Sequence, residues 1–255
     1  MTVVATVGTT HPLAFAGLAF AVLALAADGV RPVCVVAGVS AQDGARVLLR
    51  RALDAPAIRA QFDALHAADV AAFHVGALLS AEAVHAVADG LDRSPRVPVV
   101  VDPVLAASGG DALADDAALA ALSDALFPRA TLIAPNLDEA SAFLGRTIAG
   151  VPAMRDAAHA FTAFGPRAAL IKGGHLAGGD DVVDVLADGA SIRELRAPRI
   201  VGTLRGTGDL LAVTIAAGLA RGARLDDAVE RARVRVRDAI ARGVPFAGAQ
   251  VAALS

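Results

Sequence analysis

The sequence lacks tryptophan and tyrosine and has a single cysteine among its 255 residues. One cysteine excludes an internal disulfide and fits a reducing compartment, so we expect a cytoplasmic protein. Cys34 falls in the apolar run from Val33 to Val36, and we expect its thiol to be buried in the core. Aromatic residues make up 4% of the chain and its net charge is −3. These values argue against a nucleic-acid partner, which would favour a basic face and aromatic platforms.

Lysine is almost absent as well. Lys172 is the one lysine among 23 basic residues, and the others are arginines. A single lysine in so arginine-rich a chain suggests a position where an arginine guanidinium cannot replace the lysine ammonium. Lys172 is therefore a candidate functional residue.

A membrane-spanning segment or signal peptide is not expected, although Pro12 to Ala27 is almost wholly apolar. A span usually needs about 18 or more apolar residues, and this run is shorter. No lysine or arginine precedes it, whereas a secretory signal begins with a basic region. We expect a first helix that is buried on all sides, at the contact of a homodimer, and no membrane partner.

Hydrophobic residues are abundant, at 56% of the chain. Short apolar runs, which we expect to be strands, occur at Thr2–Val7, Val33–Val39, Val70–Val75, Val97–Val101, Thr131–Ala134 and Ala168–Ile171. Alanine-rich stretches, which we expect to be helices, lie between them and include Ala81–Leu91, Asp116–Leu126, Asn136–Leu144 and Met154–Phe164. This alternation predicts an α/β fold with a mostly parallel central sheet and helices on both faces.

The later part of the chain predicts a β-hairpin. Val182–Leu186 and Ser191–Leu195 flank Asp188-Gly189, a pair of residues typical of a tight turn. No linker or shift in composition divides the chain, so we expect one domain over residues 1–255.

Polar side chains follow three of the predicted strands. Asp102, Asn136 and Lys172 each stand directly after, or within two residues of, the end of an apolar run. In open α/β sheets, ligands bind beyond the carboxyl ends of the strands. Carboxylate, amide and ammonium groups at that edge suit magnesium and phosphate.

The most informative segment is Gly206-Thr207-Gly208-Asp209, which precedes an apolar run from Leu210 to Leu219. Glycine allows a sharp turn close to a ligand, and the free N–H groups at a helix start bind anions. An aspartate beside such a site is a candidate base for phosphoryl transfer to an alcohol. The alternative is a glycine-rich turn ahead of a buried helix, with Asp209 as an ordinary first-turn carboxylate.

The segment 204–212 resembles the signature of the ribokinase-like small-molecule kinases. Three further segments resemble the hydroxymethylpyrimidine/phosphomethylpyrimidine kinases of thiamine synthesis, and they cover residues 101–109, 134–140 and 170–176. The resemblance implies a ribokinase-like three-layer fold. It also implies an enzyme that uses ATP and Mg²⁺ to phosphorylate the hydroxymethyl group of a pyrimidine, and the resulting monophosphate as a further substrate.

The resemblance implies the following site residues. Asp209 takes the proton from the substrate hydroxyl, and backbone amides of Gly206, Thr207 and Gly208 hold the transferring phosphoryl group. The residues implied for the nucleotide are Lys172, Asn136, Glu139 and Thr203. Those implied for magnesium are Asp102 and Glu139. Those implied for the ring substrate are Gly8, Gln42, Gly76 and Val104.

Structural alternatives remain open for several of these residues. Asn136 and Glu139 also fit a helix N-cap followed by a first-turn acid. Asp102 also fits a turn or cap before a proline, and Gln42 fits a solvated loop. His11 is a candidate substrate contact, although we favour a loop histidine without a function.

The chain departs from the pyrimidine kinases in its substrate region. The aspartate of their N-terminal segment is replaced by an alanine at or near Ala21, and Asp209 stands where they usually have cysteine. Pyridoxal kinases do use Gly-Thr-Gly-Asp, so a pyridoxal/pyridoxine kinase is the second reading. A non-catalytic protein that binds a vitamin precursor is the third.

Overall fold

The computed structural model of the chain describes residues 1–43, 46–176, 178–200, 202, 204–246 and 248–254. Within these residues, one nine-stranded sheet has the order β3-β2-β1-β4-β5-β6-β7-β8-β9. The strands are β1 (Val3–Thr10), β2 (Arg31–Gln42), β3 (Val47–Ala52), β4 (Ala72–Val75), β5 (Val99–Val101), β6 (Leu132–Ile133), β7 (Ala168–Ile171), β8 (Asp181–Asp188) and β9 (Ser191–Pro198).

Most of the sheet is parallel. The neighbours from β2 across to β7 pair in parallel, while β3 pairs antiparallel with β2 at one edge and β8 and β9 form an antiparallel hairpin at the other. The parallel strands therefore direct their carboxyl ends to one edge of the molecule. This confirms the predicted mostly parallel sheet and the predicted hairpin.

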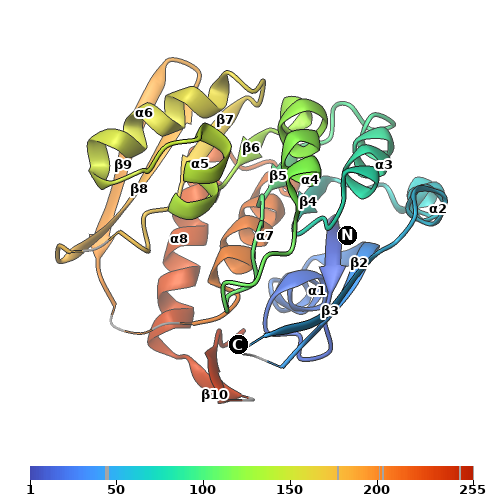
Figure 1. Cartoon of the computed structure of the whole chain (residues 1–255), viewed down its shortest axis with the longest axis horizontal. Helices are drawn as coiled ribbons and strands as arrows, with labels where there is room; N and C mark the ends of the chain where they lie inside the picture. Colours follow the sequence, from blue (N-terminus) through green and yellow to red (C-terminus); the bar gives the residue numbers. More distant parts are fainter. Residues whose placement is uncertain (44–45, 177, 201, 203, 247, 255) are drawn as a thin grey trace.

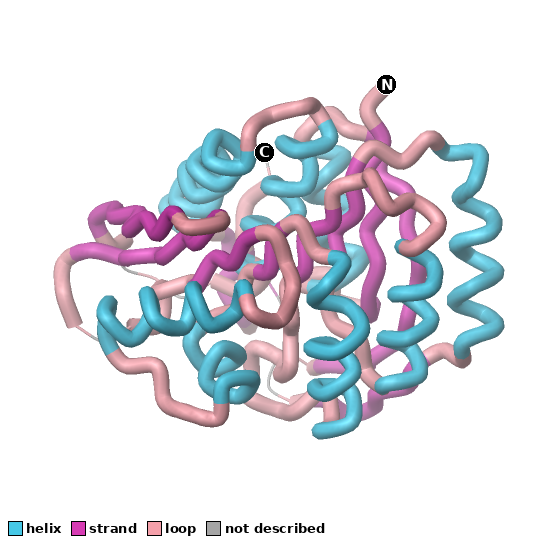
Figure 2. The backbone as a smooth tube through the Cα atoms, turned by 90° about the horizontal axis from the view of Figure 1, so that it is seen from above, coloured by secondary structure: helices cyan, strands magenta, loops and turns pink. Residues whose placement is uncertain are grey.

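Helices cover both faces of the sheet (Figures 1 and 2). One layer contains α2 (Ala55–Ala64), α3 (Ala81–Leu91), α4 (Asp116–Ala121), α5 (Leu137–Leu144) and α6 (Gly150–Thr162), and the other contains α1 (Gly17–Ala27), α7 (Thr207–Ala220) and α8 (Leu225–Ala241). Consecutive residues of a strand face opposite layers. Val4 accordingly packs in the α1/α7/α8 core and Ala5 in the other core.

Short irregular elements complete the chain. A 3₁₀ turn spans Leu65–Ala68 after α2, and α4 continues through a π-helical turn at Leu122–Leu126 into a 3₁₀ turn at Phe127–Arg129. Near the C-terminus, β10 (Val244–Phe246) and β11 (Ala249–Val251) form a separate two-stranded hairpin.

Cys34 is exposed, so the expectation of a buried thiol was wrong. Its neighbour Val35 is fully buried because it faces the opposite side of the sheet. Cys34 pairs in register with Thr6 of β1, which is buried under the α1/α7/α8 layer. The helix layer on this face of the sheet therefore covers Thr6 of β1 but not Cys34 of β2, so the Cys34 thiol is exposed to solvent.

The first helix also differs from the expectation. α1 begins at Gly17, because residues 12–16 form a loop, and within a single chain it is not buried on all sides. Leu18, Ala21 and Leu25 face the core, whereas the side chain of Leu23 is 53% exposed. An apolar composition all around a helix does not by itself show which sides are covered. No helix within the described residues is long and apolar enough to cross a membrane.

Candidate active site

The polar residues predicted at the strand ends meet at the carboxyl edge of the sheet. Asp102 directly follows β5, Lys172 directly follows β7, and Asn136 caps α5 shortly after β6. A parallel bridge joins Asn136 to Lys172, and the Lys172 amide donates to the Pro135 carbonyl at 2.9 Å. Asp209 lies in the first turn of α7. Segments more than 100 residues apart in the sequence are thus brought to one place.

Lys172 lies between two buried carboxylates. Its Nζ is 2.6 Å from Asp102 Oδ1 and 4.0 Å from Glu139 Oε2. Burial lowers the pKa of Lys172, but the charges of Asp102 and Glu139 and the hydrogen bond to Asp102 outweigh it and raise the pKa overall. Lys172 is therefore charged at neutral pH, and its ammonium can contact an anionic group at this edge.

Glu139 and Asn136 form a complete capping box. The Asn136 side chain accepts from the Glu139 amide at 2.9 Å, and Glu139 Oε2 accepts from the Asn136 amide at 2.7 Å. The capping alternative is therefore correct as a description of their contacts. Glu139 nevertheless lies beside Lys172, and burial raises its pKa to about 7. A buried carboxylate with so high a pKa gains from a nearby cation, so its predicted part in metal and phosphate binding stays a prediction.

Asp209 is buried, and its carboxylate accepts a hydrogen bond from the backbone. The Gly17 amide donates to Asp209 Oδ2 at 3.0 Å. Burial raises the pKa of Asp209 to about 6, aided by the charge of Asp102, while the Gly17 hydrogen bond and Lys172 lower it. A carboxylate with this pKa is mostly ionised at neutral pH and close enough to it to accept a proton efficiently.

The glycine-rich loop begins α7 three residues earlier than predicted, at Thr207 with Gly206 as N-cap. The first amides of a helix have no acceptor within it, so those of Thr207, Gly208 and Asp209 can bind an anion. A Cβ on Gly208 would lie 3.2 Å from Asp102 Oδ2 and 3.4 Å from Lys172 Nζ. The predicted anion site and the Asp102–Lys172 pair are therefore in contact.

We expect Gly206→Ala to destabilise the fold by about 3 kcal/mol, as measured by chemical denaturation. Gly206 has φ +80°, and a Cβ there would lie 2.4 Å from the Phe15 carbonyl oxygen. Gly222→Ala is the matched control, because Gly222 has φ +79° and nothing within 4 Å of its Cβ position. The control should cost about 1 kcal/mol, the strain of the left-handed backbone alone. Equal losses in both variants would mean that contact with Phe15 is unimportant.

The predicted substrate residues surround the same edge. A Cβ on Gly76 would lie 3.8 Å from Asp209 Oδ1, and one on Gly8 would lie 3.6 Å from the Gly76 carbonyl carbon. Val104 packs against the apolar cluster of Ala77, Leu79 and Leu113.

Gln42 is placed less directly. It ends β2, donates to Ser40 Oγ at 2.9 Å and pairs with Val47, which packs on the same apolar cluster as Val104. Its amide therefore stays a candidate substrate contact without a direct link to Asp209. Thr203 lies outside the described residues.

Three site residues were missed from the sequence. Gly17 donates its amide to Asp209, the candidate base, and its only sequence signal was that it is the sole glycine in the apolar run 12–27. His74 is fully buried beneath Gly76; its Nδ1 is 2.9 Å from Thr6 Oγ1, and burial lowers its pKa to about 4. Phe15 contacts Gly206 through its carbonyl, and its ring packs on that of His11 at 4.7 Å.

His11 lies in the loop that follows β1, as the sequence suggested, and it is buried there. It is 6% exposed, and burial is the main reason that its pKa is lowered. Within the described part of the chain, neither ring nitrogen has a hydrogen-bond partner.

The described residues contain no cluster of three or more His, Cys, Asp or Glu side chains arranged to hold a metal alone. Mg²⁺ is usually held by one or two carboxylates together with substrate phosphates and water. Asp102 and Glu139, the carboxylates predicted for magnesium, both lie within 4.0 Å of Lys172 Nζ, and their part in metal binding stays a prediction.

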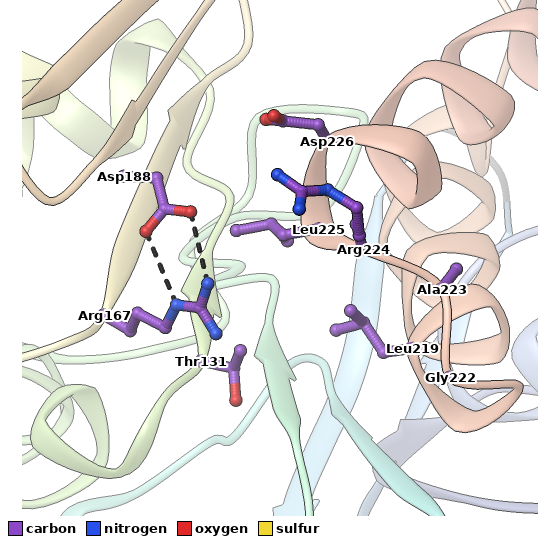
Figure 3. Close-up of a pocket in the computed structure, with 9 residues that line it drawn as sticks. All are labelled: Thr131, Arg167, Asp188, Leu219, Gly222, Ala223, Arg224, Leu225 and Asp226. Carbon is purple, nitrogen blue, oxygen red and sulfur yellow. Dashed lines mark hydrogen bonds and ion pairs between the residues drawn. The ribbon is translucent and has the colours of Figure 1, made fainter.

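A separate cavity of about 290 Å³ lies at the other edge of the sheet (Figure 3). It is bounded by Thr131 and Arg167, which precede β6 and β7, and by the turn between α7 and α8. Arg167 pairs there with Asp188 at 3.4 Å. Because it adjoins the amino ends of the strands, this cavity is not part of the candidate active site.

The free amides at the start of α7, the buried Asp209 carboxylate and the buried Lys172 ammonium are the kinds of group that phosphoryl transfer to a hydroxyl group requires. The comparisons agree with that class. A family model for phosphomethylpyrimidine kinase matches residues 13–252. The chain is 41% identical over 235 residues to the hydroxymethylpyrimidine/phosphomethylpyrimidine kinase of Streptomyces coelicolor, which covers 91% of this chain and 86% of that protein.

Solved structures share the fold. A phosphomethylpyrimidine kinase from Clostridium difficile superposes with a TM-score of 0.83 at 25% identity, covering 94% of this chain and 100% of that one. An ADP complex of Bacillus subtilis pyridoxal kinase superposes with a TM-score of 0.87 at 26% identity, covering 96% of this chain and 94% of that one. The fold is ribokinase-like, and the protein is a small-molecule kinase. It belongs to the phosphomethylpyrimidine kinase family.

Proposed function

We propose that the protein transfers the γ-phosphoryl group of ATP to the hydroxymethyl group of hydroxymethylpyrimidine, and to the monophosphate that results, in thiamine synthesis or salvage. The observation that carries this proposal is the contact of the Gly206–Asp209 helix start with the Asp102–Lys172 pair. The 41% identity with the Streptomyces coelicolor kinase supports the ring substrate.

The residues divide the reaction between them. Asp209 accepts the proton of the attacking hydroxyl at a carboxylate oxygen, while the Gly17 amide keeps that carboxylate oriented. The amides of Thr207, Gly208 and Asp209 stabilise charge on the transferring phosphoryl group. Lys172 neutralises phosphate charge as a point charge.

Magnesium and ATP complete the proposal. Mg²⁺ supplies Lewis-acid neutralisation of the phosphates when it is bound, and Asp102 and Glu139 would hold it. Asn136 orients Glu139 through the capping box. The ADP complex of the Bacillus subtilis relative supports nucleotide binding by this fold.

The deciding experiment is an ADP-release assay with ATP and Mg²⁺, with hydroxymethylpyrimidine and pyridoxal offered separately and a no-substrate control. Turnover of hydroxymethylpyrimidine, lost when EDTA removes the metal, is the expected result. Selective turnover of pyridoxal would overturn the ring substrate and leave the kinase class intact.

Pyridoxal/pyridoxine is the second candidate because Asp209 follows Gly208, where the pyrimidine kinases usually have cysteine. Turnover of both compounds would mean that one site accepts both rings. Binding of ATP with turnover of neither would support the third reading, a protein that binds a vitamin precursor without catalysis.

We also propose a cytoplasmic homodimer built from single kinase domains. The one continuous sheet supports a single domain, and the lone cysteine supports a reducing compartment. Exposed apolar side chains on the adjacent elements α1, β2 and β3 support a subunit contact, and they are Leu23, Val39, Leu48 and Leu49. Sedimentation at the mass of a monomer would rule out the dimer.

A further inference from the structure

Arg233 is an arginine on α8 that is buried although it lies outside the cluster described above. Its exposed fraction is 8%. Nε donates to Asp184 Oδ2 at 2.8 Å, and a terminal nitrogen donates to the Leu195 carbonyl at 2.7 Å. Arginine is rarely buried unless it is paired, so these contacts mark a specific position rather than a solvated helix face.

Asp184 connects this arginine to the strand end that carries Lys172. Its second oxygen, Oδ1, accepts from the Gly173 amide at 2.8 Å. Both of its oxygens are therefore committed, one to α8 and one to the residue that follows Lys172. Asp184 is 8% exposed, and such charge-assisted hydrogen bonds are stronger when water is excluded.

The backbone at Gly173 has little freedom. A Cβ there would lie 1.9 Å from the Val183 carbonyl oxygen, so only glycine can bring the chain this close to β8. On the other side, the Lys172 amide donates to Pro135. The Lys172 backbone is thus held between the loop that leads to Asn136 and, through Gly173, the Asp184–Arg233 pair.

We propose that Arg233 and Asp184 are positioning residues for Lys172. They fix the Gly173 amide, and this sets the direction from which Nζ reaches Asp102 and the transferring phosphate. α8 packs on α7, which carries Asp209. A single helix layer therefore locates both the base and the ammonium. The inference rests on the proposed function only in giving Lys172 a part in phosphate binding.

The chain offers a matched control two residues further along α8. Arg235 is also partly buried; it donates to Thr214 Oγ1 at 3.0 Å and to the Ala24 carbonyl at 2.9 Å. It contributes packing and hydrogen bonds of a similar kind but has no contact with Asp184. Comparing Arg233→Met with Arg235→Met therefore separates positioning of Lys172 from general support of α8.

In steady-state kinetics, Arg233→Met should lower kcat by roughly tenfold or more while KM for both substrates changes little, because misplacement of about 1 Å is costly in the transition state. Arg235→Met should stay within about twofold of the wild type, since Arg235 has no contact with the Asp184–Gly173 link to Lys172. Adding Arg233→Met to Lys172→Met should cause no further loss, because the residue that is positioned is then gone.

A second readout requires no ring substrate. Because Lys172 is the only lysine, [¹³C,¹⁵N]-lysine labelling yields a single Nζ signal by NMR, which belongs to Lys172. Its chemical shift, alone and with a non-hydrolysable ATP analogue, should change in Arg233→Met and match the wild type in Arg235→Met. Should Arg233→Met fail to fold, Arg233→Gln keeps one donor, introduces no lysine and can replace it in both measurements.

The proposal is overturned if the two arginine variants lose kcat equally, if the Lys172 signal is the same in Arg233→Met and the wild type, or if the Arg233 effect persists in full without Lys172. A wild-type enzyme that phosphorylates neither ring would contradict the proposed function alone. The NMR comparison would still decide the link from Arg233 to Lys172.

Discussion

Asp209→Asn is expected to lower kcat by about 10²–10⁴-fold with little change in either KM, because general-base catalysis contributes about that much. Asparagine has nearly the same shape and can still accept from the Gly17 amide, which now donates to Asp209 Oδ2 at 3.0 Å. It cannot take the proton of the substrate hydroxyl. Steady-state kinetics with saturating ATP and Mg²⁺ measures the loss.

The pH profile gives the control for this prediction. Burial raises the pKa of Asp209 to about 6, and a base works only when it is deprotonated. The kcat/KM of the wild type should therefore fall about tenfold per pH unit below that value and level off above it. The residual activity of Asp209→Asn should lack this acid limb. A variant that keeps most of its activity would remove Asp209 from the mechanism.

Lys172→Met is expected to lower kcat by about 10²–10³-fold, since it removes a preorganised positive charge from the reacting phosphate. It should also destabilise the folded protein by about 3 kcal/mol, because breaking a buried ion pair leaves the remaining charge without its partner. Asp102 and Glu139, at 2.6 and 4.0 Å from Nζ, are the carboxylates affected. Kinetics and urea denaturation measure the two effects separately.

Lys172→Arg tests whether charge alone is sufficient. It restores the cation, so it should recover much of the stability lost in Lys172→Met. The planar guanidinium is larger and cannot occupy the position of Nζ between Asp102 and Gly208. We expect kcat to stay well below that of the wild type. Full activity in Lys172→Arg would show that the lone lysine has no special role.

The local sequence pattern was sufficient to predict helices with a clear hydrophobic periodicity and strands with clear sequence boundaries. The helix Ala81–Leu91 and the strand Ala168–Ile171 match the structure to the residue. β1 continues to Thr10 instead of ending at Val7. Thr9 and Thr10 pair with β2, but threonines do not extend an apolar run, so the sequence pattern did not include them. α2 and β3 were missed because neither has a clear hydrophobic pattern: β3 is largely exposed although Val47, Leu48 and Leu49 are apolar, and α2 buries only Ala55, Ile58 and Phe62.

The placement of the candidate site residues was easier to predict than the contacts that support them. Asp102, Lys172 and Asp209 follow strands or glycines whose sequence signals are local, and the parallel topology brings them together. The Gly17 amide and the Asp184–Arg233 pair act across 192 and 49 residues of sequence. No local pattern identifies such contacts. Arg233 is accordingly buried, although no local signal distinguishes it from the other arginines of α8.

The hydrogen bond from Gly17 to Asp209 has a consequence for how this enzyme can change its substrate. Gly17 begins α1 directly after the loop at residues 12–16, and a Cβ on Gly17 would lie 3.8 Å from the ring of His11, a candidate substrate contact. A mutation that reshapes this loop to fit another ring also moves the donor that orients the base. A change in this loop is then expected to alter the preferred ring and the turnover rate together. A change of ring preference alone is expected to arise more easily from residues further from Gly17, such as those around Gln42.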